Sequence, residues 1–175
     1  MTDTSPSATR LDLVVFLHGV GARGEDLLGL GDLWKSDLPG VAFAAPDGPF
    51  AFDGGAFGRQ WFSILGVTPQ NRGDRLGAAA SAFDAVVDTA IAQAGTTAER
   101  TALVGFSQGS IMALDAVGRG RAFAGVLAYS GRLGRPLAAP SRTPIRLVHG
   151  RADGVIPAAE SVAAEAALKA AGLEV

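Results

Sequence analysis

The chain alternates short apolar segments with longer amphipathic ones, and this alternation restricts its fold more than any other feature. Five segments have the length and the aliphatic, β-branched character of strands, and they cover residues 11–17, 41–45, 101–106, 125–130 and 145–149. Nearly continuous apolar runs are typical of strands that are covered on both faces. Strands that alternate with helices predict a mostly parallel α/β sheet, joined by right-handed crossovers and flanked by helices.

Three helices are predicted around these strands. Within residues 73–95, apolar side chains return at three- and four-residue steps, and Gly95 is suited to end the helix. A second helix follows Ser107, and a third begins at Pro157 and ends near Gly172. A chain of 175 residues fits one domain. We therefore expect a disordered or extended tail over residues 1–10 and one domain over residues 11–175.

The composition excludes several classes of function. The net charge is −2, and the arginines are scattered along the chain, where we expect them to be solvated or ion-paired at the surface. Neither feature favours binding to nucleic acid. The absence of cysteine excludes disulfides, thiolate metal sites and a thiol nucleophile. The polar N-terminal residues lack the apolar region of a signal peptide, and no apolar run approaches the length of a membrane span. These features predict a cytoplasmic protein.

A loop rich in glycine, proline and aromatic residues covers residues 45–63. It leaves the carboxyl end of the second predicted strand, which is the edge where open α/β sheets bind ligands. We expect Phe57, Trp61, Phe62 and the following Leu65 to form an apolar substrate wall that favours uncharged acyl groups. The alternative is a loop that contributes its aromatic side chains to the core.

The segment Gly105-Phe106-Ser107-Gln108-Gly109 lies between a predicted strand and a predicted helix. This strand-turn-helix setting is what a nucleophile elbow requires. The glycines are needed because the turn packs backbone tightly around a serine in a strained conformation. Ser107 is therefore the predicted nucleophile, and the alternative is a glycine-rich turn without a catalytic role.

Two further segments complete a candidate catalytic site. His18-Gly19-Val20-Gly21 ends the first strand, and the backbone N–H of Val20 is predicted to form an oxyanion hole with that of Gln108. Asp153 follows the last strand, which suits the acid in a chain order of Ser, Asp and His. The alternatives are a simple turn at Val20 and a turn-capping role for Asp153.

These residues resemble the phospholipase/carboxylesterase family of α/β-hydrolases, which are relatives of acyl-protein thioesterases. The resemblance rests on Leu17-His18-Gly19, on residues 57–62 and 105–109, and on residues 149–153 with Ile156-Pro157. It implies an α/β-hydrolase fold from about residue 11 onward. It also implies hydrolysis of carboxylic esters or thioesters through an acyl-enzyme, without cofactor or metal, often by a homodimer. Ser107 is then the nucleophile, Asp153 the acid, and Val20 and Gln108 the oxyanion donors.

The catalytic histidine departs from the family pattern. In the family it lies in a loop after one further strand, whereas the sequence has only His18 and His149. We expect His149 to form a structural hydrogen bond rather than to act as the base. The catalytic base is then absent, and the hydrolase domain lacks the C-terminal strand and helix of the family. We therefore expect the activity of this chain to be very low. The alternative is a hydrolase-like protein that binds an acyl or ester ligand without cleaving it. A dienelactone-hydrolase-like enzyme is excluded because it needs a cysteine nucleophile.

Overall fold

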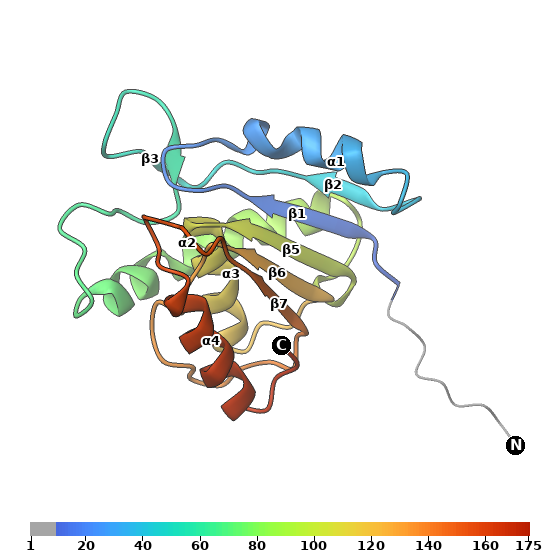
Figure 1. Ribbon diagram of the computed structural model, residues 1–175. Coiled ribbons are helices and arrows are strands. Elements are labelled where there is room, and N and C mark those ends of the chain that lie inside the picture. Colours follow the sequence, from blue (N-terminus) through green and yellow to red (C-terminus); the bar gives the residue numbers. More distant parts are fainter. Residues whose placement is uncertain (1–9) are drawn as a thin grey trace, which may run out of the picture.

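A parallel sheet of five strands forms the centre of the protein (Figure 1). The computed structural model describes residues 10–175, so the tail predicted for residues 1–10 lies outside the described residues except for Arg10. The strand order is β2-β1-β5-β6-β7, and every neighbouring pair is parallel. All five predicted strands are confirmed, and they are β1 (Leu13–Leu17), β2 (Ala42–Ala44), β5 (Thr101–Phe106), β6 (Gly125–Tyr129) and β7 (Ile145–Val148).

The three predicted helices are also confirmed. They are α2 (Arg72–Gln93), α3 (Gln108–Gly118) and α4 (Ala159–Ala170), of which α4 begins two residues after Pro157. The sequence did not predict α1 (Leu28–Trp34) or the 3-10 turns η1 (Gly24–Leu27) and η2 (Ala98–Arg100). Helix α1 is short and contains two glycines, so its propensity signal is weak.

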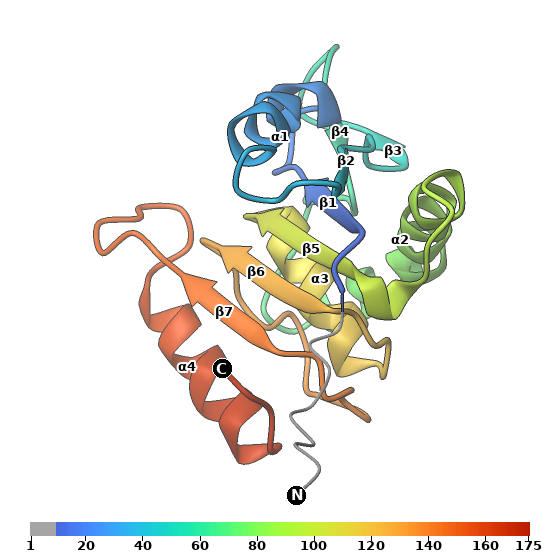
Figure 2. The ribbon, with the colours of Figure 1, turned by 90° about the vertical axis from the view of Figure 1, so that its right-hand side faces the viewer.

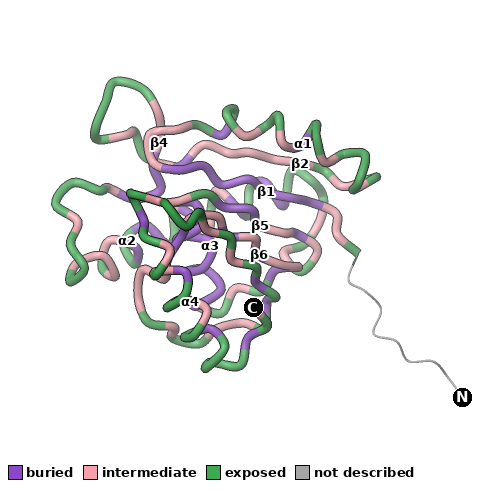
Figure 3. Tube along the Cα trace, viewed as in Figure 1, coloured by how far each residue is buried: buried purple, intermediate pink, exposed green. Residues whose placement is uncertain are grey.

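The sheet has a hydrophobic core on each face. On one face, α2, α3 and α4 pack on the strands, with Phe83, Met112 and Leu168 among the buried side chains. On the other face, α1 packs over Val14, Phe16 and Val104 (Figure 2). The central strands and α3 are accordingly the most buried parts of the chain (Figure 3). Burial on both faces explains why the strands have nearly continuous apolar sequences.

Loops at the carboxyl edge of the sheet contain a small hairpin that the sequence did not predict. Strands β3 (Phe50–Ala51) and β4 (Arg59–Gln60) pair antiparallel within the segment expected to be a loop (both labelled in Figure 2). The Arg59 guanidinium donates to the carbonyl oxygens of Gly48 and Pro49, each at 2.8 Å. Arg59 is therefore a structural anchor of this loop rather than the solvated or ion-paired side chain expected.

The last residues of the chain lie beside the start of β7. The N–H of Ile145 donates to the carbonyl oxygen of Glu174 at 2.9 Å, and Leu173 is buried in the larger core. Within residues 10–175, no helix combines the length and the apolar character needed to cross a lipid bilayer.

Candidate active site

Ser107 occupies a strained turn between β5 and α3. Its φ angle is 51°, in the left-handed region that residues other than glycine seldom adopt. A Cβ atom on Gly105 would lie 2.5 Å from the nitrogen of Ser110, and one on Gly109 would lie 2.1 Å from the carbonyl oxygen of Leu17. The packing therefore requires glycine on both sides of the serine, and the turn has the geometry expected of a nucleophile elbow.

The segment that follows β1 lies beside this turn. A Cβ atom on Gly19 would lie 3.5 Å from the Cβ of Ser107. Val20, Ser107 and Gln108 line one cavity of about 220 Å³. The structure thus brings together the proposed nucleophile and the two residues predicted to supply oxyanion donors.

The Gln108 side chain has a structural role that the sequence did not reveal. Its Oε1 accepts a hydrogen bond from the backbone N–H of Trp61, and its Nε2 donates to the carbonyl oxygen of Phe62, each at 2.7 Å. Gln108 is 2% exposed, so both bonds are buried. They fasten the end of the aromatic loop to the first turn of α3.

His18 is fully buried and both of its ring nitrogens are engaged. Nε2 accepts from the N–H of Gly48 at 2.8 Å, so the proton resides on Nδ1, which donates to the carbonyl oxygen of Gly19 at 2.7 Å. Burial lowers the pKa of His18, which keeps the ring neutral. His18 therefore stabilises the conformation of the turn that contains Gly19 and Val20, and its ring has no free nitrogen to act as a base.

The structure places the four residues predicted to form the substrate wall in different environments. Phe62 lines the cavity with Ser107, together with Ile64 and Val67. Trp61 is fully buried in the core, where its Nε1 donates to the carbonyl oxygen of His18 at 2.9 Å. Phe57 is 90% exposed and Leu65 is 60% exposed, and neither lines this cavity. Of these four residues, the structure therefore brings Phe62 alone to the cavity that contains Ser107.

Asp153 lies in the turn that follows β7. Its Oδ1 accepts hydrogen bonds from the N–H groups of Val155 and Ile156, each at 2.9 Å. These backbone bonds, and then one from the Ser130 side chain, lower the pKa of the Asp153 carboxyl. Val155 and Ile156 line the cavity that contains Ser107, so the turn held by Asp153 forms one wall of the site.

His149 does not have a free nitrogen. Its Nε2 lies 2.7 Å from the carbonyl oxygen of Ile156, which can only accept, so Nε2 carries a proton. Its Nδ1 lies 2.6 Å from the hydroxyl oxygen of Ser161 in α4. Asp153 Oδ2 is 3.4 Å from Nε2. The structural hydrogen bonds expected of His149 are therefore present.

Two arginines also line the cavity, and neither was predicted from the sequence to be a site residue. Arg72 begins α2 and Arg132 lies in the loop after β6. No pattern in the sequence connects them, because only the folded chain brings these two positions to one cavity. Among residues 10–175, no three histidine, aspartate or glutamate side chains gather as metal ligands.

The comparisons with known proteins agree with this geometry. The sequence pattern of the Phospholipase/Carboxylesterase family matches residues 4–175. The chain belongs to this family. The chain is 38% identical to Esterase YpfH of Escherichia coli K12 over 173 residues, which cover 98% of this chain and 74% of that protein. It is 29% identical to a probable inactive carboxylesterase of Oryza sativa subsp. japonica, over 91% of this chain and 72% of that protein.

A solved structure shows the same fold. The crystal structure of esterase PE8 superimposes with a TM-score of 0.86 at 33% identity, over 97% of this chain and 83% of that one. The predicted α/β-hydrolase architecture, a mostly parallel sheet flanked by helices, is thereby confirmed.

Proposed function

We propose that this chain supplies the nucleophile, the oxyanion donors and the acid of a serine esterase that cleaves carboxylic esters and thioesters. The observation that carries the proposal is the strained Ser107 turn, which shares a cavity with Val20 and Gln108. A serine is held in such a conformation only where the surrounding structure enforces it, and such strain is concentrated at functional sites. Membership of the family and the similarity to Esterase YpfH and esterase PE8 support the same activity.

In the proposed reaction, the Ser107 oxygen attacks the carbonyl carbon of the ester while a base removes its proton. The carbonyl electron pair moves onto oxygen, and the backbone N–H groups of Val20 and Gln108 stabilise the negative charge. Collapse of the intermediate expels the alcohol or thiol, which takes the proton from the base, and leaves an acyl group on Ser107. Water repeats the sequence and releases the carboxylic acid, while Asp153 orients the base.

We further propose that the base is a histidine outside residues 1–175. Both ring nitrogens of His18 and of His149 are held in hydrogen bonds, and the carbonyl partners fix the tautomer of each ring. Removing the base of such a triad costs on the order of 10⁶ in kcat, whereas oxyanion stabilisation and binding alone leave roughly 10³ to 10⁴ over water. The 175-residue chain is then a very slow esterase.

The engaged histidines also favour a second candidate, a hydrolase-like protein that binds an ester without cleaving it. The name of the rice relative, a probable inactive carboxylesterase, favours it too. The two candidates differ in what happens when a histidine is supplied. An esterase gains turnover, whereas a binding protein does not.

The test is a p-nitrophenyl ester assay on the 175-residue chain and on a chimera that continues from Val175 with the part of Esterase YpfH beyond the matched region. The esterase proposal expects turnover by the chimera, its loss in Ser107→Ala, and a far slower 175-residue chain. If every form binds the ester and none cleaves it, the binding protein is the correct reading. If the 175-residue chain matches the chimera and loses its rate in His149→Gln, His149 is the base.

A further inference from the structure

The cavity beside Ser107 combines an apolar wall with two positive charges. Most of its lining is aliphatic or aromatic, as expected of an acyl pocket. The charged side chains in the lining are both arginines, Arg72 and Arg132, and within the described residues no carboxylate joins them. A neutral acyl chain has no use for a guanidinium pair, since burying charge without a partner is costly.

One carboxylate of the surrounding protein pairs with these two guanidinium groups. The Arg132 side chain is only 15% exposed, and its Nη1 donates to Glu160 Oε1 of α4 at 2.9 Å. No other hydrogen bond of that guanidinium and no ion pair of Arg72 is found among residues 10–175. Among the described residues, Glu160 is therefore the carboxylate found paired with this cavity's arginines, and it pairs with Arg132.

The two charges also influence each other. Burial has the largest effect on the pKa of Arg132 and lowers it; the negative charge of Glu160 then raises this pKa, and the positive charge of Arg72 lowers it by a smaller amount. Both side chains line the same cavity, so a single ligand in it can lie beside both. An anion between them would relieve the repulsion and restore the solvation that Arg132 has lost.

We infer that Arg72 and Arg132 form a carboxylate-binding subsite, and that the acyl group cleaved at Ser107 is short and carries a second carboxylate, as in the half ester of a dicarboxylic acid. This inference rests on the proposed function for its reaction, but the binding site stands on its own geometry. The fork of donors on a guanidinium matches a carboxylate in a bidentate way, and such charge-assisted bonds are strong in a poorly hydrated cavity. The small volume, about 220 Å³, favours a short chain between the ester carbonyl and the carboxylate.

The inference revises the expectation that the site favours uncharged acyl groups. That expectation considered only the aromatic loop, whereas α2 and the loop after β6 contribute the charges. The competing explanation is that Arg132 only tethers its loop to α4 through Glu160, and that Arg72 is a solvated side chain.

Calorimetric titration distinguishes the two explanations without any need for turnover. The 175-residue chain with Ser107→Ala is titrated with monomethyl glutarate, dimethyl glutarate and methyl 3-phosphonopropanoate. We expect the half ester to bind at least about tenfold more tightly than the neutral diester, and added salt to remove part of the difference. Equal binding of the half ester and the diester overturns the inference, and tighter binding of the phosphonate overturns the choice of carboxylate.

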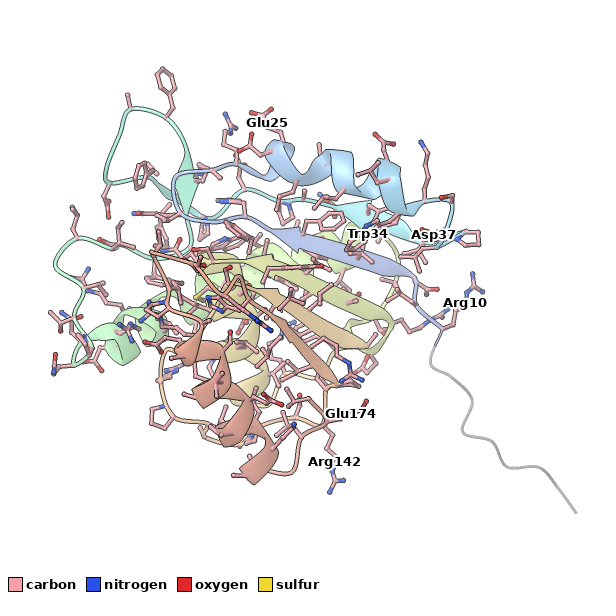
Figure 4. All side chains as sticks on the ribbon, viewed as in Figure 1. Arg10, Glu25, Trp34, Asp37, Arg142 and Glu174 are labelled. Atoms are coloured by element: carbon pink, nitrogen blue, oxygen red, sulfur yellow. The ribbon has the colours of Figure 1, made fainter. Side chains whose placement is uncertain are left out.

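Variants of the pair locate the effect. Arg72→Met is expected to abolish the preference. Arg142→Met removes the same charge from an exposed residue that does not line the cavity, and it should leave the preference unchanged (Figure 4). Because Arg132→Met also breaks the contact with Glu160, the complementary variant is Glu160→Gln. Releasing Arg132 from its carboxylate should tighten half-ester binding, whereas a purely structural tether predicts no gain.

The binding result and the esterase assay fail independently. If half-ester binding shows the expected pattern while no form of the enzyme cleaves an ester, the subsite stands and the proposed esterase activity is wrong. If the chimera cleaves neutral esters while binding shows no preference for the half ester, the activity stands and the subsite is wrong.

Discussion

Replacing Gln108 by alanine is predicted to destabilise the protein strongly, although the backbone N–H proposed for the oxyanion hole remains. The substitution removes the partners of the Trp61 N–H and the Phe62 carbonyl oxygen. Leaving a buried polar group unpaired costs about 1–3 kcal/mol. Trp61 is fully buried, so its N–H takes the upper value, about 3 kcal/mol. Phe62 lines the cavity, where water can replace the lost donor, so its carbonyl takes about 1 kcal/mol.

The sum is about 4 kcal/mol, which corresponds to a fall in Tm of about 8–16 °C in a domain of this size. Thermal unfolding followed by circular dichroism measures the shift. Gln93→Ala is the matched control, because it removes the same side-chain atoms from an exposed position at the end of α2 and should change stability by less than about 0.5 kcal/mol. If Gln108→Ala melts within about 2 °C of Gln93→Ala, the Gln108 side chain does not hold the aromatic loop and the reasoning fails.

Three further predictions concern Gly109, Ser107 and Asp153. Gly109→Ala should destabilise by about 1–3 kcal/mol or more in urea denaturation, because its Cβ would meet the Leu17 carbonyl oxygen at 2.1 Å. Gly29→Ala, in α1 with nothing within 4 Å, should instead stabilise by about 0.4–1 kcal/mol, and equal effects of the two would contradict the packing argument. Ser107→Gly should raise stability by about 1–2 kcal/mol in the same assay, because glycine relieves the strain at φ 51°, and a loss of stability would argue against strain at the elbow. Asp153 has a lowered pKa in the folded state, so its contribution to stability is present above the unfolded pKa, about 3.9, and is lost as the pH falls through the folded value. Melting curves from pH 3 to pH 7 should therefore show a weaker loss on acidification for Asp153→Asn than for the original chain, and parallel curves would refute the role of this carboxyl.

The sequence was sufficient for the parts of the fold that local patterns determine. Apolar runs located the strands, and a helical period located α2, because burial on a sheet selects residues at those spacings. The tight turn at Ser107 was predictable for a similar reason, since only glycine fits at residues 105 and 109. Helix α1 and the β3–β4 hairpin were missed because tertiary contacts stabilise them, including the bonds that Arg59 donates to Gly48 and Pro49.

The cavity was less predictable than the fold. A run of aromatic residues does not show which side chain faces inward, and so Trp61 proved to be core while Phe57 is exposed. The meeting of Arg72 and Arg132 depends on where α2 and the loop after β6 lie in the folded chain. Likewise, the histidine bonds that exclude His18 and His149 as free bases involve partners up to 30 residues away.

The central claim is that Ser107 is the acylated nucleophile, and covalent trapping tests it most directly. The chimera described above is incubated with a fluorophosphonate, digested, and analysed by peptide mass mapping. We expect one adduct, located on Ser107, that forms far more slowly on the 175-residue chain and is absent from Ser107→Ala. An adduct on another residue, or labelling of Ser107→Ala at the rate of the unmodified chimera, would contradict the account.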